Sequence, residues 1–440
     1  MLKRYLLEEL DEGDVERLCL RNPLQDAGIM AQCRDIFDAV ARRGDEALRQ
    51  FTGEFDGVEL EALRVTSQEM QKALDQVSDD TRDALQRAAD NLRSFHKMQS
   101  WEEPRVDIEE GVECWRESRP IEKVGLYVPA GTAPLPSTVL MLGVPARLAG
   151  CLQVILCTPP RQDGSVSPET LAAAGLVDAD AVFKIGGAQA VAALTLGTAS
   201  VPRVDKIFGP GNRWVQSAKM LSMQYGTGVD LPAGPSEVLV VADDSADPCF
   251  VAADLLSQAE HGSDSQVVLV STSKKLISRV VLEMEEQLKD LPRRGLAADA
   301  LQQSFSLLCH DLDAAIQFSN RYAPEHLILN IEDADRWAGC VLSAGSVFLG
   351  PWTPEVAGDY ASGTNHTLPT SGSARACSGV SLDSFLKKIT FQSITRGGLE
   401  RLSPTLQQLA RVEGLEAHRR AVSLRLEKDP SQPHSDEDAP

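Results

Sequence analysis

The chain contains 440 residues, enough for two or three domains of ordinary size. Its 64 acidic and 43 basic residues give a formal net charge of −21, so it repels phosphate backbones and anionic lipid, and we expect neither nucleic-acid nor membrane binding. Apolar residues form 43% of the chain, as is ordinary for a globular protein, and no apolar run reaches the roughly 18 residues that span a bilayer.

The N-terminal sequence and the cysteines indicate a reducing compartment. The opening MLKRYLLEEL lacks the apolar stretch of a signal peptide, because Glu8 and Glu9 interrupt it. The nine cysteines contain no CxxC pair and are too few for a disulfide scaffold. We therefore expect a cytoplasmic protein with free thiols.

The N-terminal part of the chain has mainly helical patterns. Residues 1–25 have the pattern of a short acidic arm that is mostly helical. Helical apolar spacing continues over residues 29–49 with a break at Gly44, and a stronger helix begins near Ser78. The apolar stripe of that helix consists of Leu85, Ala88, Leu92 and Phe95.

From Val124 onward, short β-rich runs alternate with helical stretches. The runs do not alternate strictly between apolar and polar residues, as expected of parallel strands that are covered on both faces. They are Val124–Val128, Val154–Cys157, Ala181–Ile185, Lys206–Phe208, Val238–Ala242, Val267–Val270, Phe305–Leu308, Leu327–Ile331 and Ser346–Leu349. Because these are many strands for one sheet, we predict an α/β fold with two Rossmann-like parallel-sheet domains and small helical extensions at both termini.

The same changes of pattern suggest domain limits. A boundary is expected near residues 231–235 (LPAGP), and the sheet pattern stops after about Ser371. Ser403 and Pro404 have the form of an N-cap and a first helical residue, which predicts a helix from there to about Leu424. Beyond the N-terminal arm, we divide the chain into a first α/β domain (26–122 and 237–380), a second α/β domain (123–236), a C-terminal helical extension (381–428) and a disordered acidic tail (429–440).

Generic catalytic motifs are missing: there is no GxGxxG after a strand, no GxxxxGK[ST], no HExxH and no GxSxG. Polar segments beside the strands are the candidates instead. In LLSQAEHG, Gln258 and His261 are three residues apart at the end of a helix that Pro248 opens, where free carbonyl groups favour a cation. This pair suits a metal or a cationic ligand; the alternative is a histidine that only caps the helix.

Two further segments carry acid–base groups. Glu325 and His326 directly precede a β-rich run, which suits proton transfer near neutral pH; the alternative is an exposed polar loop. Residues 351–370 lack a regular period and form a long loop in which Asp359 and His366 are the ligand candidates; the alternative is an ordinary surface loop.

Glu413 and His418 lie in the C-terminal helical stretch. On an unbroken helix their side chains would point about 140° apart. Both can face one site only if Gly414 loosens the turn or if the sites of two subunits are involved. The alternative is that Glu413 and His418 are ordinary charged or polar residues on the surface.

Three glycine-containing turns follow β-rich runs. They are YVPAG, which begins at Tyr127, GGAQ, which ends at Gln189, and FGPGN, which ends at Asn212. Small residues at the carboxyl ends of strands let a ligand approach the backbone, as at the switch points of α/β sheets, although tight turns need glycine in any case. Together the turns predict a nucleotide-sized cleft.

The candidate metal ligands are two imidazoles, a carboxylate and an amide on distant segments. This donor set suits zinc with open positions better than a sealed structural site, where thiolates dominate. The residues by themselves therefore indicate a metal-assisted enzyme with a nucleotide-like ligand.

Several long segments occur together, in the same order, in one known family. They are VGLYVPAGTAPLPSTVLML, FKIGGAQAVAALTLGT, VDKIFGPGN, LPAGPSEVLV, DLLSQAEHGSDSQ, RYAPEHL, AGSVFLG and AGDYASGTNHTLPT. In these segments the chain closely resembles histidinol dehydrogenases, and the N-terminal helices and VEGLEAHRRAV extend the match over nearly the whole chain. The resemblance implies a zinc enzyme of histidine biosynthesis that oxidises L-histidinol through L-histidinaldehyde to L-histidine with two NAD⁺.

The resemblance also implies a role for each candidate residue. One zinc ion per subunit would be held by Gln258, His261, Asp359 and His418. Glu325 and His326 would be the acid–base pair, and substrate would contact Ser236, His366 and Glu413 as well as the zinc ligands and His326. NAD⁺ would contact Tyr127, Gln189 and Asn212. The family forms an intertwined homodimer in which the partner's C-terminal segment completes each active site. One departure is Ala130, where glycine is more usual.

Three alternatives compete with this interpretation. A relative could act on another small alcohol, but the retained His366, Glu413 and His418 argue against it. A nucleotide-binding protein without activity would show damage at Glu325 or His326, which are intact. A zinc hydrolase would not need the three glycine-containing turns.

Overall fold

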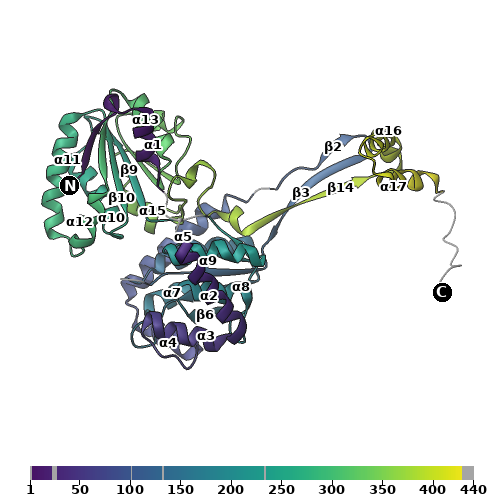
Figure 1. The fold of residues 1–440 in the computed structure, drawn as a ribbon, viewed down its shortest axis with the longest axis horizontal. Helices are drawn as coiled ribbons and strands as arrows, with labels where there is room; N and C mark the ends of the chain where they lie inside the picture. Colours follow the sequence, from purple (N-terminus) through teal and green to yellow (C-terminus); the bar gives the residue numbers. More distant parts are fainter. Residues whose placement is uncertain (1, 22–26, 101, 131–132, 232–233, 429–440) are drawn as a thin grey trace. The chain divides into compact units, whose positions relative to one another are not determined.

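The computed structural model describes residues 2–21, 27–100, 102–130, 133–231 and 234–428. It contains two compact units, one formed by Met1–Ser100 with Pro120–Phe385 and one by Trp101–Arg119 with Leu386–Pro440 (Figure 1). The predicted disordered tail, 429–440, lies outside the described residues. Within the described ranges, no helix is both long and apolar enough to cross a membrane.

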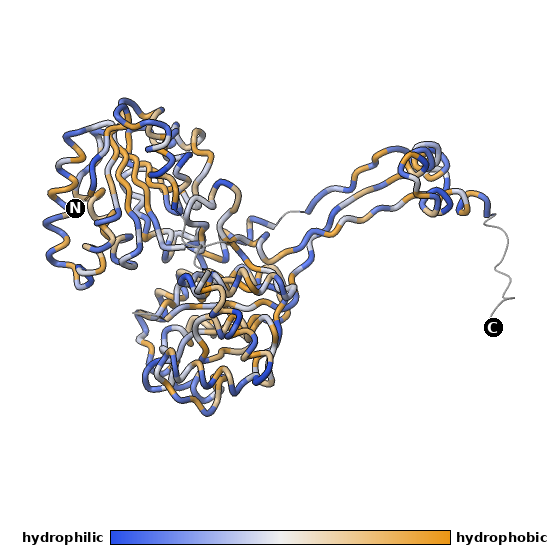
Figure 2. The backbone as a smooth tube through the Cα atoms, viewed as in Figure 1, coloured by the Kyte–Doolittle hydropathy of each residue, from blue (hydrophilic) through white to orange (hydrophobic). Residues whose placement is uncertain are grey.

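The first unit contains a six-stranded parallel sheet with the strand order β1-β11-β10-β9-β12-β13. Its strands are β1 (Lys3–Leu6), β9 (Glu237–Ala242), β10 (Gln266–Ser271), β11 (Phe305–Leu308), β12 (His326–Asn330) and β13 (Ser346–Leu349). The central strands β9 and β12 are buried at every position, and Figure 2 shows strands of this sheet as hydrophobic stretches.

Helices cover both faces of this sheet. One face packs against α10 (Pro248–Ala259), α11 (Lys274–Gln287) and α12 (Arg294–Gln302), and the other against α1 (Glu12–Cys19) and α13 (Leu312–Tyr322). Two short helices, α14 (Ala334–Ala338) and α15 (Glu355–Tyr360), follow β12 and β13.

The first unit also contains a five-stranded parallel sheet with the order β6-β5-β4-β7-β8. Its strands are β4 (Lys123–Tyr127), β5 (Gln153–Thr158), β6 (Ala181–Lys184), β7 (Lys206–Phe208) and β8 (Gly228–Val229). One face carries α4 (Ser67–Gln76), α5 (Asp79–Lys97), α6 (Pro136–Ala149) and α7 (Pro168–Leu176). The other carries α2 (Ala27–Arg43), α3 (Asp45–Phe51), α8 (Gly187–Leu196) and α9 (Arg213–Ser222).

The second unit is a three-stranded sheet followed by two helices. The sheet has the order β14-β3-β2, with β2 (Val106–Glu109), β3 (Val112–Pro120) and β14 (Leu386–Ile394). The rings of Trp115 and Phe391 stack at 5.3 Å between centroids. The helices α16 (Arg396–Val412) and α17 (Glu416–Glu427) meet at Gly414, which has a φ of 71°.

The predicted α/β fold with two parallel sheets is confirmed. Each β-rich run is a strand whose ends lie within one residue of the expected positions. The break at Gly44 falls between α2 and α3, and Ser78 is the N-cap of α5. In the stripe of α5, however, Phe95 is 45% exposed, and the neighbouring His96 is buried in its place.

The N-terminal part differs from the prediction in two ways. The arm of residues 1–25 contains the strand β1, which pairs with β11 at the edge of the sheet. Its four residues are too few to show a strand pattern in the sequence. The helices between residues 27 and 97 pack on the five-stranded sheet, whereas the predicted division grouped residues 26–122 with the sheet of 237–380. Their apolar stripes meet residues such as Phe183 and Val124 of that sheet.

The C-terminal extension, predicted to be helical, contains the strand β14, which follows a short 3-10 helix at Leu382–Phe385. The predicted helix start at Ser403 and Pro404 is also wrong: α16 begins at Arg396, capped by Thr395, whose Oγ1 accepts a hydrogen bond from the Gly398 N–H at 3.1 Å. Pro404 lies inside this helix, and Ser403 accepts a hydrogen bond from the side chain of Gln407 rather than from the backbone.

Candidate active site

A cavity of about 770 Å³ in the first unit is lined by residues from both parallel sheets and their loops. It brings together most of the residues that the sequence predicted, namely Asn212, Ser236, Gln258, His261, Glu325, His326, Asp359 and His366. Tyr127 and Gln189 are buried and do not line it. Glu413 and His418 belong to the second unit, where the break at Gly414 separates them, so they do not share an unbroken helix.

The two sheets meet the cavity with opposite ends of their strands. The six-stranded sheet contributes its amino ends, since Glu237 begins β9 and His326 begins β12. The five-stranded sheet contributes the turn after β7, at a carboxyl end. Its strand order reverses between β4 and β7, which is the switch point where α/β sheets bind ligands.

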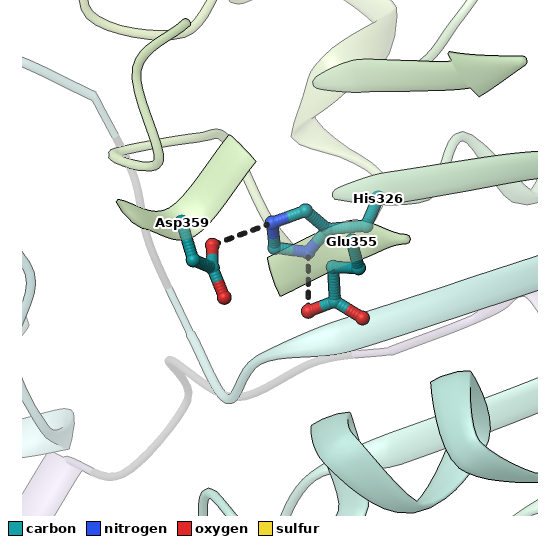
Figure 3. Close-up of side chains that lie close together, drawn as sticks. All are labelled: His326, Glu355 and Asp359. Carbon is teal, nitrogen blue, oxygen red and sulfur yellow. Dashed lines mark ion pairs between the residues drawn. The ribbon is translucent and has the colours of Figure 1, made fainter. Parts of the chain in front are cut away.

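His326 lies between two carboxylates (Figure 3). Its Nε2 is 3.6 Å from Asp359 Oδ1, and its Nδ1 is 3.7 Å from Glu355 Oε1. Nδ1 also donates a hydrogen bond to the backbone carbonyl of Glu237 at 3.1 Å. Because Nδ1 must keep its proton for this bond, Nε2 is the nitrogen that can accept a proton. Nε2 makes no hydrogen bond within the described part of the chain.

Burial and the neighbouring charges shift the pKa values of the acid–base groups. Burial lowers the pKa of His326, but the carboxylates of Glu355, Glu325 and Asp359 outweigh it and raise that pKa to about 10. Burial raises the pKa of Glu325 to about 8 and also raises the pKa of Glu355. For Asp359, the effect of burial is overcome by His326 and the other imidazoles, so its pKa is lowered. The site therefore holds an ionised Asp359 among groups that can exchange protons.

Gln258 and His261 come from the end of α10. This helix ends at Ala259, so His261 follows the helix and does not lie in its last turn as predicted. The side-chain amide of Gln258 faces the carboxylate of Glu355, and the orientation that satisfies both groups places the amide nitrogen toward that carboxylate, where it can donate to Oε2 at 3.3 Å. Burial lowers the pKa of His261, which favours the neutral imidazole that binds metals.

His366 links the long loop to α6. Its Nδ1 donates to the Asp359 carbonyl at 3.0 Å, and its Nε2 lies 3.1 Å from Thr138 Oγ1. These hydrogen bonds of His366 hold the predicted loop of residues 351–370 in place. The loop is not irregular throughout, because it contains α15.

Two glutamates at this site were missed by the sequence reasoning. Glu355 joins His326 and Asp359 in a buried group whose ligand atoms lie within 4.8 Å of one another, a geometry that can hold a metal ion. Glu355 and Asp359 are four residues apart, and this spacing would have revealed the pair had the segment been predicted as helical. Nothing in the sequence pattern marked Glu237 as a residue of the site, because a glutamate at the start of a strand is usually exposed.

The described parts of the three predicted glycine turns lie close together, and Gly131 of the first turn lies outside the described residues. The Tyr127 hydroxyl accepts a hydrogen bond from the Gly187 N–H at 3.1 Å. A Cβ on Gly209, whose φ is 128°, would lie 2.0 Å from the Tyr127 carbonyl oxygen, so only glycine fits there. Gln189 is buried, and its Oε1 makes no hydrogen bond with any described residue. Asn212 caps α9 by accepting from the N–H groups of its first turn.

A buried ion pair lies behind the third turn. Lys219 donates to the Gly209 carbonyl at 2.9 Å and pairs with Asp230, and their side chains are 2% and 1% exposed. Asp230 in turn accepts from the Gly209 N–H at 2.7 Å. Both polar groups of Gly209 are thus held by one ion pair.

The two parallel sheets with their crossover connections, the glycine turns at the switch point and the buried acid–base groups define an α/β enzyme. A sequence model of the histidinol dehydrogenase family matches residues 20–426 of the chain. The chain therefore belongs to the histidinol dehydrogenase family, and it is an oxidoreductase.

Individual relatives agree with this assignment. The histidinol dehydrogenase of Bacteroides thetaiotaomicron is 52% identical over 409 residues, covering 93% of this chain and 96% of the relative. The chloroplastic histidinol dehydrogenase of Arabidopsis thaliana is 50% identical over 428 residues, covering 97% and 91%. The crystal structure of histidinol dehydrogenase from Elizabethkingia anophelis superposes with a TM-score of 0.93 at 47% identity, covering 97% of this chain and 98% of that one. The resemblance predicted from the sequence is confirmed.

Proposed function

We propose that this chain oxidises L-histidinol to L-histidine through L-histidinaldehyde, with two NAD⁺ in succession and one zinc ion per subunit. The observation that carries the proposal is the buried pair of Glu325 and His326 in the cavity that Gln258, His261 and Asp359 also line. Membership of the family supports the substrate.

The residues of the first unit fit a zinc ion. Gln258 offers an amide oxygen in the cavity, His261 favours its neutral form and Asp359 its ionised form. In this proposal they hold the ion together with His418 of the partner subunit. Bound zinc would anchor the imidazole and amine of the substrate and, as a positive charge, would lower the pKa of His326 toward that of a base.

His326 and Glu325 would divide the proton transfers. His326 takes the alcohol proton on Nε2 as hydride leaves for NAD⁺, while Nδ1 keeps its proton on the Glu237 carbonyl. Glu325 takes a proton from the water that adds to the aldehyde. The backbone N–H of Glu237 donates to Glu325 Oε2 at 2.8 Å, which orients the carboxylate. Holding the aldehyde between the two oxidations prevents its loss.

NAD⁺ would lie at the switch point of the five-stranded sheet and contact Tyr127, Gln189 and Asn212. The helices α8 and α9 begin at these turns, and helix N-termini present N–H groups and positive dipole ends to phosphates. The buried Oε1 of Gln189, which makes no hydrogen bond within the described ranges, is a further polar group for a ligand. The net charge of −21 attracts a cationic substrate.

Two copies of the chain would form an intertwined, cytoplasmic homodimer with shared active sites, in which Glu413 and His418 of the partner subunit complete each site. A complementation experiment tests this arrangement. His326→Asn and His418→Ala are each expected to be inactive, and their co-expression should restore activity in mixed dimers. Mixed dimers without activity would contradict the sharing of sites.

The proposed activity is tested by following NADH from L-histidinol with purified, zinc-loaded protein and a chelator-treated control. We expect two NADH per histidinol, lost on chelation and restored by zinc. No NADH from histidinol, but NADH from another small amino alcohol, would favour the alternative of a relative with a different substrate.

A further inference from the structure

Arg21 follows α1 and is held in one orientation beside the cavity. Its guanidinium lies 3.5 Å from the centre of the Tyr322 ring, and its Nη2 donates to the Tyr322 carbonyl at 2.7 Å. Its Nη1 is 3.0 Å from Glu237 Oε2, and the two side chains of this ion pair are 11% and 3% exposed. A planar guanidinium that stacks on a ring and binds a carboxylate and a carbonyl has little freedom left.

Glu237 connects Arg21 to the acid–base pair. Its backbone N–H donates to Glu325 Oε2 at 2.8 Å, and its carbonyl accepts from His326 Nδ1 at 3.1 Å. Its carboxylate also accepts a hydrogen bond from the Ser371 N–H. The orientation of Glu325 and His326 thus depends on the backbone of Glu237, whose side chain Arg21 and Ser371 hold in place.

Arg21 also holds the chain just before Glu325. The same Nη2 lies 3.4 Å from the Ala323 carbonyl, at the end of α13, where carbonyl groups lack helical partners and favour a cation. Ala323 has a φ of 52°, in the left-handed region, which is strained for a residue other than glycine. A bend of this kind persists only where its surroundings hold it, and Arg21 contacts it directly.

We propose that Arg21 is a positioning residue, which holds Glu237 on one side and the end of α13 on the other and thereby sets the positions of Glu325 and His326. This inference rests on the proposed function, since it assigns a role toward the same acid–base pair. It makes Arg21, two residues after α1, part of the active site, although the sequence pattern indicates only a separate arm.

The test compares zinc-loaded full-length wild type with Arg21→Met and Arg21→Lys. Met keeps the length and apolar stem of arginine without charge or donors, and Lys restores the charge without the planar fork. We expect Arg21→Met to lower kcat for L-histidinol by about tenfold to a hundredfold, because small misplacements of catalytic groups have effects of that order. The KM for L-histidinol and the zinc content should not change, and Arg21→Lys should recover part of the lost kcat.

Arg147→Met is the matched control. Arg147 also binds backbone carbonyls, those of Val177 at 3.2 Å and Cys151 at 3.0 Å, and pairs with Asp180 at 2.7 Å. None of these partners belongs to the site, so this variant should lose thermal stability but keep kcat. An equal loss of kcat in Arg147→Met, or a wild-type kcat in Arg21→Met, overturns the inference. If Arg21→Met does not fold, kcat of Arg21→Lys decides in the same way.

Crystal structures separate this inference from the proposed function. In Arg21→Met, we expect Glu325 Oε2 to have left hydrogen-bond distance of the Glu237 N–H. An intact bond in this variant overturns the inference. If the wild type forms no NADH from L-histidinol, the proposed function fails, and this structural comparison still decides the role of Arg21.

Discussion

The two parallel sheets present different chemistry to one cavity. The six-stranded sheet meets it with the amino ends of β9 and β12 and with the end of α10, and the contributing groups are charged or ionisable side chains such as Glu325 and His326. The five-stranded sheet contributes the turn after β7, and α8 and α9 begin at its glycine turns.

The difference follows from the direction of the helices. The carboxyl end of a helix favours cations and its amino end favours anions. The side of the six-stranded sheet, where α10 ends, therefore suits a metal and a cationic substrate, whereas the side of the five-stranded sheet, where α8 and α9 begin, suits phosphates. Substitutions beside the six-stranded sheet should therefore change turnover, whereas those beside the five-stranded sheet should change stability and the KM for NAD⁺.

The largest effect is expected on the side of the six-stranded sheet. His326→Asn removes the nitrogen that we propose accepts the alcohol proton, and it should lower kcat by roughly a hundredfold or more, measured as NADH formation from L-histidinol. His310→Asn is the control, because His310 has an exposed side chain and pairs only with Asp311 among the described residues. A wild-type kcat in His326→Asn would refute its role as the base.

Glu325→Gln tests whether Glu325 and His326, both beside the six-stranded sheet, have separate roles in the two oxidations. Because the amide cannot take a proton from water, oxidation of L-histidinaldehyde should slow by roughly a hundredfold or more, with a smaller effect on oxidation of the alcohol. Single-turnover NADH formation from each substrate measures the two steps. Equal losses in both steps would contradict separate roles for Glu325 and His326.

On the side of the five-stranded sheet, Lys219→Met leaves Asp230 as a buried, unpaired charge. The free energy of unfolding should fall by about 3–5 kcal/mol, as measured by urea denaturation. Lys289→Met removes an exposed ion pair with Glu286 and should cause no measurable loss. Equal stabilities of the two variants would show that the pair behind the glycine turn does not stabilise the fold.

Gly209→Ala tests the close approach of that turn to Tyr127. The added Cβ would meet the Tyr127 carbonyl oxygen, so the turn must shift, and we expect a lower Tm and a higher KM for NAD⁺. Gly175→Ala lies in α7 with no atom within 4 Å of the new Cβ, and it should gain about 0.5–1 kcal/mol of stability. An unchanged KM in Gly209→Ala would remove this turn from the cofactor site.

A pH-dependent effect concerns Asp56, at the end of a π-helical turn beside the same sheet. Burial raises the pKa of its carboxyl from 3.8 to about 6, and its Oδ2 makes no hydrogen bond with described residues. The unfolded chain then ionises first, so this group lowers stability as pH rises from about 4 to about 6. Asp56→Asn should therefore raise Tm relative to wild type at pH 7 but not at pH 4. The same difference in Tm at both values would contradict this assignment.

Much of the fold is encoded in local patterns. The buried strands, such as β9 and β12, are apolar along their whole length, so their segments are recognisable without knowledge of their neighbours. The segments that carry Gln258, Glu325 and Asp359 are likewise distinctive, because polar residues gather beside buried strands.

Other features depend on contacts between distant residues. The strand state of β1 comes from pairing with β11, some 300 residues away, and four residues have no period of their own. Glu237 and Glu355 look like surface charges in the sequence, and only packing buries them beside His326. Arg21 contacts Glu237 and Tyr322 because α1 packs on the six-stranded sheet. A local pattern reports what a segment prefers by itself, whereas burial and charge pairing are set by residues that the chain brings together on folding.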